Sequence, residues 1–134
     1  MPGSTSVGSQ VSDEVSLEEF RRLAKGGNKY HAARTWSELC GRMFDSTAEA
    51  RRGEALVMME RAGEINQLAY QVRWDLSEKP KVTYTVDFAY CDGKTGERIR
   101  EDVKGVLTRD TRTKLAWLKQ KYGIEVVVLK TEEV

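Results

Sequence analysis

The sequence contains few of the residues that form disulfide frameworks or zinc centres. Among 134 residues there are 2 cysteines, Cys40 and Cys91, and 1 histidine, His31. Two thiols and one imidazole fall short of the four ligands of an ordinary zinc site, and two cysteines cannot build a disulfide framework. The single histidine also excludes catalytic mechanisms that need two histidines. The reducing cytoplasm is therefore the compartment that we expect.

Long apolar segments are missing as well. No run approaches the ~20 apolar residues that a membrane helix needs, and the Gly/Ser-rich start has no signal-peptide core. We therefore expect neither export nor a membrane partner. With 40% hydrophobic and 32% charged residues, the composition is that of a globular protein with one core. We expect residues 1–15 to be a flexible tail, because they lack apolar periodicity, and residues 16–134 to form one domain.

The charges are unevenly distributed, although the formal net charge is only +1. Residues 109–121 hold five cations against a single anion, Asp110. Acidic residues gather instead near the two ends of the chain. A basic face of this kind is typical of nucleic-acid binding, but solvated helix faces are also charged, so both interpretations stay open here.

Apolar periodicity and capping residues predict the order helix, three strands, helix, strand. A capping box and a glycine stop bound the first of these helices, and a shorter helix is expected earlier, from Ser16 to Gly26. The predicted elements are helices over 46–62 and 109–122 and strands over 68–76, 82–90, 98–106 and 124–129. Residues 28–44 carry no assignable pattern. Hairpin-connected strands followed by a helical crossover imply an α/β fold, a mixed sheet flanked by helices.

Glu49 lies on the apolar side of the 46–62 helix. It falls about 20° from Leu56 around the helix axis, whereas Glu54 falls about 160° away and is expected to meet water. An inward carboxylate is costly unless it is paired or binds a metal. Ser46 and Glu49 also form a capping box, so an end-capping role is the competing explanation.

Two predicted neighbouring strands carry the other candidate residues. Asp87 interrupts an apolar strand, and Asp102 and Lys104 share one face of the next. If these strands pair, two carboxylates lie side by side and repel each other unless a cation lies between them. Oxygen ligands without a histidine or cysteine cluster suit Mg²⁺ or Mn²⁺, and the lysine could act on a water or on phosphate charge. The alternative is an exposed Asp102–Lys104 salt bridge on a solvated strand.

Several pieces of the sequence, in this order, resemble a family of small phage and prophage proteins described only as a domain of unknown function. That family is placed in the PD-(D/E)xK nuclease superfamily, near the Holliday junction resolvases. The matching pieces are Phe44–Ala50, Gly63–Ile65, Gln71, Tyr84–Tyr90 and Glu101–Gly105. The superfamily core is αβββαβ, the same order that the periodicity predicts. Val86 stands where the superfamily name has proline, a position that varies.

The resemblance implies specific roles for five residues. Asp87 and Asp102 match the acidic positions of the motif, Lys104 matches its lysine, and Glu49 matches a glutamate that supports the metal from the first helix. The carbonyl of Val103 is implied as a backbone ligand. Glu101 falls on the opposite strand face and is left outside the site.

The resemblance implies a Mg²⁺-dependent endonuclease, with Mn²⁺ as a possible substitute, acting on branched DNA in phage recombination or DNA processing. It also implies a homodimer in the cytoplasm of a bacterial host, because resolvases cut two strands symmetrically. The cations assigned to DNA contact are Lys29, Arg34, Arg42, Arg109, Arg112, Lys114, Lys119 and Lys121. Two alternatives remain: a nuclease for flaps or single strands, and a non-catalytic DNA-binding accessory protein on the same fold.

Overall fold

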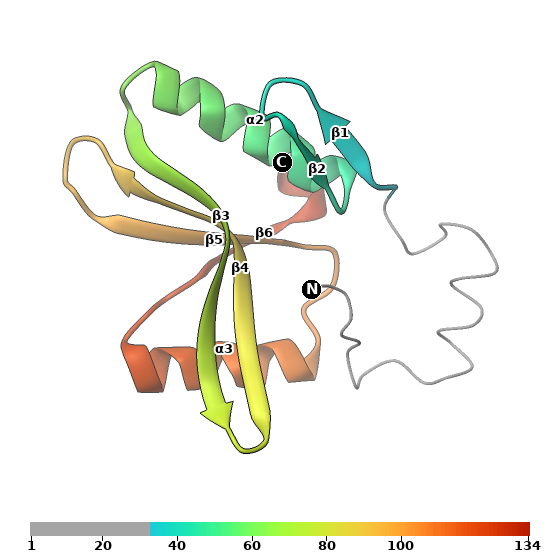
Figure 1. The fold of residues 1–134 in the computed structure, drawn as a ribbon, viewed down its shortest axis with the longest axis vertical. Coiled ribbons are helices and arrows are strands. Elements are labelled where there is room, and N and C mark those ends of the chain that lie inside the picture. Colours follow the sequence, from blue (N-terminus) through green and yellow to red (C-terminus); the bar gives the residue numbers. More distant parts are fainter. Residues whose placement is uncertain (1–32) are drawn as a thin grey trace.

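The computed structural model describes residues 33–134, in which two helices alternate with the strands of two sheets (Figure 1). In chain order the elements are β1 (Thr35–Ser37), β2 (Arg42–Phe44), α2 (Thr47–Arg61), β3 (Ile65–Glu78), β4 (Lys81–Asp92), β5 (Arg98–Lys104), α3 (Arg109–Tyr122), β6 (Val127–Lys130) and η1 (Thr131–Glu133). The expected tail over 1–15, the expected helix from Ser16 and the cation Lys29 lie outside the described residues.

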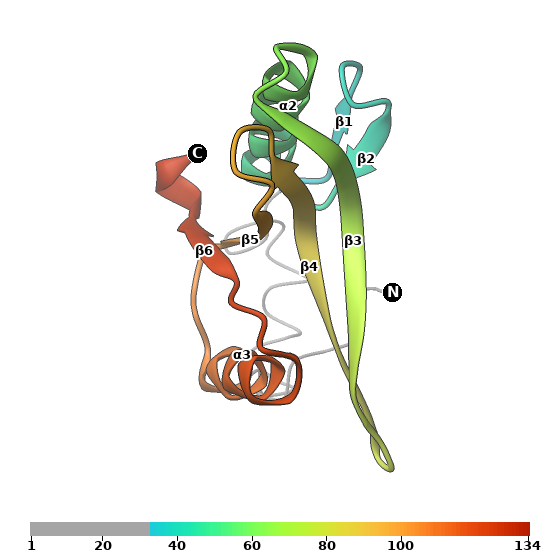
Figure 2. The ribbon, with the colours of Figure 1, turned by 90° about the vertical axis from the view of Figure 1, so that its left-hand side faces the viewer.

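The main sheet has four strands in the order β3-β4-β5-β6. The first two pairings are antiparallel hairpins, whereas β5 and β6 are parallel. The crossover helix α3 connects these last two strands. Figure 2 shows this sheet from its side, with β3 and β6 at the two edges. The predicted class is therefore confirmed: an α/β arrangement with a mixed sheet flanked by two helices.

The helix ends follow from local capping chemistry. Ser46 caps α2, because its hydroxyl accepts the backbone N–H of Glu49 at 3.0 Å. Gly123 ends α3 in the left-handed conformation, at a φ of 71°, which glycine adopts without steric cost. Both helix ranges agree with the capping signals in the sequence.

The strand ends differ more from the prediction. The first sheet strand is longer than predicted, Ile65–Glu78, and the last is shorter and later, Val127–Lys130. Ile124, predicted to open that strand, is instead buried in the core beside α3. The segment without an assignable pattern contains β1 and β2, a two-stranded hairpin of three residues a side. Strands this short show no measurable alternation, which is why periodicity missed them.

Two hydrophobic clusters lie along β4 and hold the helices to the sheet. Phe88 and Tyr90 join Leu56 of α2 in one cluster. Tyr84 and Val86 join the other, with Leu118 of α3. All four strand residues have even numbers, so Asp87 lies on the opposite face of β4. Along the strand its position falls between the two clusters.

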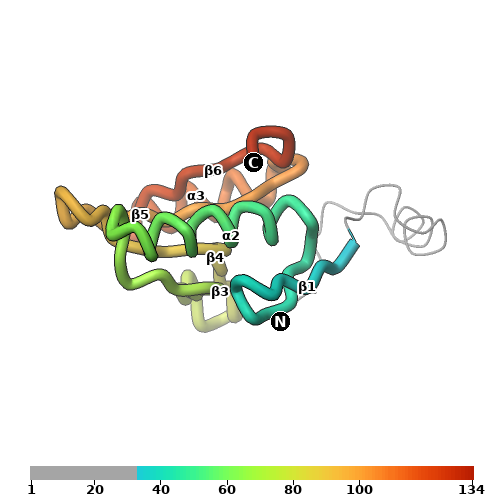
Figure 3. The backbone as a smooth tube through the Cα atoms, turned by 90° about the horizontal axis from the view of Figure 1, so that it is seen from above, coloured from blue at the N-terminus to red at the C-terminus, as the bar shows by residue number. Residues whose placement is uncertain are grey.

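Helix α2 has neighbours on two sides. Figures 2 and 3 show the β1–β2 hairpin on one side of α2 and the C-terminal end of the chain on the other, and α2 contacts β1, β2 and η1.

Neither helix within residues 33–134 is long and apolar enough to cross a membrane.

Candidate functional site

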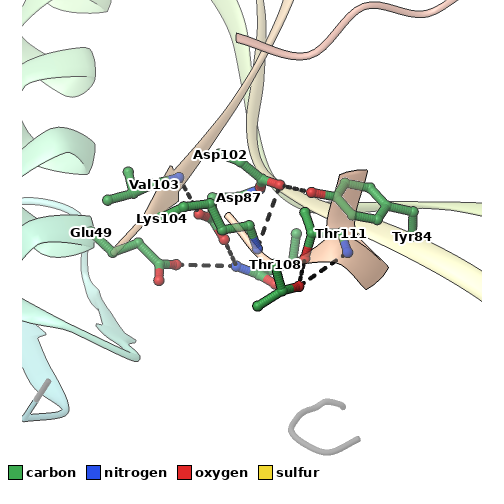
Figure 4. Close-up of polar contacts among 9 residues, drawn as sticks. Glu49, Tyr84, Asp87, Asp102, Val103, Lys104, Thr108 and Thr111 are labelled. Atoms are coloured by element: carbon green, nitrogen blue, oxygen red, sulfur yellow. Dashed lines mark hydrogen bonds and ion pairs between the residues drawn. The ribbon is translucent and has the colours of Figure 1, made fainter. Parts of the chain in front are cut away.

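The sheet register brings Asp87 and Asp102 together where β4 and β5 begin to separate. Phe88↔Glu101 is the last pair of this ladder, and the two aspartates follow it. Beyond it the side chains replace the backbone ladder: Asp102 Oδ1 accepts the N–H of Asp87 at 2.9 Å, and Asp87 Oδ2 accepts the N–H of Val103 at 2.8 Å. Each carboxylate thus satisfies a backbone donor on the neighbouring strand, and this fixes both side chains (Figure 4).

Asp102 is completely buried, with 0% of its surface exposed. Its Oδ2 accepts a hydrogen bond from the Tyr84 hydroxyl and lies 3.7 Å from Lys104 Nζ. The Lys104 ammonium also lies 5.9 Å from the centre of the Tyr84 ring. An exposed Asp102–Lys104 salt bridge is therefore excluded, because the carboxylate has no contact with water. Only the Lys104 end of the pair reaches solvent.

Glu49 reaches the same place from α2. It is 7% exposed, and its carboxylate accepts a hydrogen bond from Gln71 Nε2 at 3.2 Å. The same nitrogen lies 3.4 Å from Asp87 Oδ1, so one amide links the helix to the sheet. The helix cap is a hydrogen bond from the backbone N–H of Glu49 to the Ser46 hydroxyl. The Glu49 carboxylate takes no part in it and contacts the site instead. The two explanations offered for Glu49 are thus compatible.

The site concentrates negative charge away from water. Burial, with Asp45 and Asp102 nearby, raises the pKa of Glu49 to about 7. Burial, with Asp102 and Glu49, raises the pKa of Asp87 well above its usual value, and burial raises that of Asp102. For Lys104 burial lowers the pKa, but the three carboxylates outweigh it and the net direction is upward. One ammonium group thus faces three carboxylates, which favours binding of a further cation.

The donor set fits a hard divalent cation. Glu49, Asp87 and Asp102 offer carboxylate oxygens, and Val103, which binds Asp87 through its N–H, has the carbonyl that the resemblance implies as a ligand. Within residues 33–134, no three His, Cys, Asp or Glu side chains converge tightly enough to enclose a metal by themselves. Mg²⁺ usually binds one or two carboxylates and keeps several waters, so two aspartates with a nearby glutamate are the kind of oxygen ligands that it takes.

Glu101 lies on the other strand face, as strand alternation predicts. It is 3% exposed, and its carboxylate takes two hydrogen bonds from Arg52 of α2, at 2.8 and 2.7 Å. The Tyr90 hydroxyl also donates to it. Its charge is therefore satisfied by a partner outside the site.

The predicted DNA-binding cations are not gathered in one place. Arg34 is exposed, and the Arg42 guanidinium lies 4.5 Å from the centre of the Tyr70 ring. Arg109 and Arg112 are exposed on the first turns of α3.

Three other α3 cations already have partners in the protein. Lys114 pairs with Asp110 at 3.2 Å and Lys119 with Glu125 at 2.7 Å, while Lys121 donates to backbone carbonyls of β3. Of the eight predicted cations, Arg109 and Arg112 therefore combine exposure with a position shortly after the site on the chain.

One expectation on α2 was wrong. Glu54 does not simply face water: its carboxylate accepts the hydroxyl of the buried Ser37 at 2.7 Å. The β1–β2 hairpin packs on that side of the helix, and no periodic pattern in the sequence predicts this hairpin.

Two residues of the site have no role in the sequence prediction. Gln71 and Tyr84 both touch the predicted carboxylates directly. Both belong to the pieces that carry the family resemblance, which was the available signal. Their alternating positions on β3 and β4 otherwise mark them only as strand residues.

Comparison with known proteins identifies a family. The family model described as "Protein of unknown function (DUF1064)" matches residues 27–130. The chain belongs to this family, and the matched range contains Glu49, Gln71, Asp87, Asp102 and Lys104. A search of curated proteins and a search of solved structures each find no match.

Proposed function

We propose that this member of the DUF1064 family is a divalent-metal-dependent DNA endonuclease of the PD-(D/E)xK type. The observation that supports this most strongly is the arrangement of Asp87, Asp102 and Lys104 on adjacent strands, with the Glu49 carboxylate supplied by α2. A buried acidic pair with one lysine is costly for stability. Such a cost is typical of a site that works on a charged substrate.

The proposed chemistry assigns each side chain a task. Glu49, Asp87, Asp102 and the Val103 carbonyl would hold Mg²⁺ or Mn²⁺. Such a cation, when bound, would neutralise the scissile phosphate and lower the pKa of a water. Lys104, oriented by Asp102, would donate a hydrogen bond to the attacking water or to a phosphate oxygen. Hydrolysis forms one oxygen–phosphorus bond and breaks another, and the leaving oxygen takes up a proton.

The substrate proposed is branched DNA, such as a four-way junction, cut by a homodimer. Symmetric cleavage of two strands needs two sites, which a two-fold dimer provides. The exposed Arg109 and Arg112 would contact backbone phosphates near the site. Phage DNA recombination or processing in the cytoplasm of a bacterial host is the biological setting proposed.

A panel of labelled DNA molecules tests this function. Four-way junction, flap, duplex and single-stranded DNA are incubated with the protein in Mg²⁺, in Mn²⁺ or in EDTA. We expect the junction to be cut in either metal and no substrate to be cut in EDTA. Cleavage confined to flaps or single strands would change the substrate class. Binding without cleavage of any substrate would identify a DNA-binding accessory protein instead.

A further inference from the structure

Gln71 has an unusual backbone for a strand residue. Its φ is 52°, in the left-handed region that non-glycine residues seldom adopt. It nevertheless stays within the regular ladder, between the pairs Tyr70↔Phe88 and Val72↔Val86. This register sets Gln71 opposite Asp87, the central aspartate of the site. Residues in sparsely populated conformations cluster at functional sites, where the surroundings hold them in place.

The Gln71 side chain makes the link between helix and sheet in the site. Its Nε2 lies 3.2 Å from Glu49 Oε2 and 3.4 Å from Asp87 Oδ1. A primary amide has two N–H donors, so it can bond to both carboxylates at once. Gln71 is itself exposed, whereas Glu49 is buried and Asp87 is half-buried, so the amide bonds to both carboxyl groups from the solvent side. Within the described residues, no other hydrogen bond joins the Glu49 side chain to the sheet.

We infer that Gln71 is a positioning residue that holds the helix-borne Glu49 against the strand-borne Asp87, so that both carboxylates are ready to receive one divalent cation. The inference rests on the proposed metal-dependent function and adds a residue to it. Whenever both are ionised, Glu49 and Asp87 repel each other, and without a shared donor Glu49 would turn away from the sheet. A cation would then have to bring Glu49 back, so loss of the amide weakens metal binding. Partners of metal ligands commonly contribute about 10- to 100-fold to metal affinity in this way.

The chain contains a matched control for this residue. Gln67 lies on the same strand, is also exposed and also has a positive φ, 58°, but its Oε1 accepts from Cys91 Sγ at 3.8 Å instead of contacting the site. Glycine tolerates both backbone positions. Gln67→Gly and Gln71→Gly therefore make the same kind of backbone change, and only the second removes the amide from the carboxylates.

The test is a titration of the DNA-free protein with Mn²⁺, followed by electron paramagnetic resonance of the free ion. We expect Gln71→Gly to weaken Mn²⁺ binding by about 10-fold and Gln67→Gly to leave it unchanged. Melting temperatures in EDTA show whether either variant has lost its fold. In a Glu49→Gln background, Gln71→Gly should have little further effect, because the two residues act through one contact.

Each other outcome is decisive. Equal Mn²⁺ affinity in wild type and Gln71→Gly would overturn the inference and leave the proposed function standing. Tighter binding in Gln71→Gly would also overturn it, because the amide would then compete with the cation. A wild-type protein that binds no Mn²⁺ would remove the metal-dependent function itself, and the role of Gln71 with it.

Discussion

At the scale of single residues, the site is a place where the protein gives up stability. Asp87, Asp102 and Glu49 lose water, and their mutual repulsion is offset in part by Lys104 and by hydrogen bonds from Gln71, Tyr84 and two backbone N–H groups. Folding therefore favours the protonated carboxyls, while a bound cation would favour the ionised ones.

This balance predicts how the metal-free protein responds to pH. The pKa of Glu49 is raised from 4.5 to about 7, so its contribution to stability is complete below pH ~4.5 and is lost as the pH rises through ~7. We expect the melting temperature in EDTA to fall between pH 5 and pH 8. Glu49→Gln cannot ionise and should be more stable than wild type at pH 8, by about 3 kcal/mol.

Glu97→Gln, an exposed change on the β4–β5 turn, is the control for this experiment. The melting temperature of this variant should change with pH as that of the wild type does. A wild-type melting temperature that is flat or rises from pH 5 to pH 8 in EDTA would contradict the burial of an ionisable Glu49.

The sequence identifies Glu49, Asp87, Asp102 and Lys104 as candidates because each obeys a simple periodic rule. Helical geometry directs Glu49 inward, and strand alternation separates Asp87 from its apolar neighbours. Gln71 could not be found in this way, because its contact depends on a positive φ and on the cross-strand register. Tyr84 follows the alternation as a core residue of β4, so its hydrogen bond to Asp102, formed where β4 and β5 separate, has no signal in the pattern.

At the scale of elements, Arg52 and Glu101 join α2 to β5. Arg52 lies one helical turn after Glu49, and Glu101 directly precedes Asp102, so their bidentate pair connects the two elements that carry these site residues. The Glu101 side chain is only 4% exposed and that of Arg52 24%. The pair therefore sets the spacing between α2 and β5 on the face opposite the aspartates.

Removing one partner of this pair should be costly. Arg52→Met leaves the Glu101 carboxylate buried without its cation, and we expect a loss of about 3 kcal/mol. The double variant Arg52→Met/Glu101→Leu should recover much of this loss, because no charge stays buried. Urea unfolding midpoints measure both effects. If Arg52→Met unfolds at the wild-type urea concentration, the pair does not hold α2 to the sheet.

Element order was predictable because the helices and the long strands have strong periodicity and clear caps. The strand ends were less predictable: β3 begins three residues before the predicted strand and includes Gln67, which has a positive φ and lies at a register shift. The β1–β2 hairpin was missed because it is too short to show a period. That omission also caused the error at Glu54, whose partner Ser37 lies in β1.

At the scale of the whole molecule, the net charge of +1 does not show which cations are paired within the protein and which are exposed. Several lysines of α3 are paired within the protein, whereas Arg109 and Arg112 are exposed on its first turns. Counting cations along the sequence therefore overestimates those available to DNA. Pairing across elements, such as Lys119 with Glu125, becomes visible only in the fold.

The two arginines should dominate DNA binding by α3. We expect Arg109→Ala/Arg112→Ala to weaken junction binding and to reduce the slope of log K against log salt concentration by about 2, because each phosphate contact contributes ~0.9. Lys119→Ala should change the affinity and the slope less, because Glu125 already neutralises the Lys119 ammonium. Fluorescence anisotropy across a salt series gives affinity and slope together. An unchanged slope in the double variant would place the DNA on another surface.

The most direct test of the nuclease itself is the single-turnover rate at which wild type and Asp102→Asn cleave a labelled four-way junction in Mg²⁺. Asparagine keeps the shape of this buried side chain and removes its charge, and a melting curve checks the fold. We predict a rate lower by at least about 100-fold, with junction binding retained, since binding depends on surface cations. Cleavage by Asp102→Asn at the wild-type rate would contradict the assignment of this site as the active site.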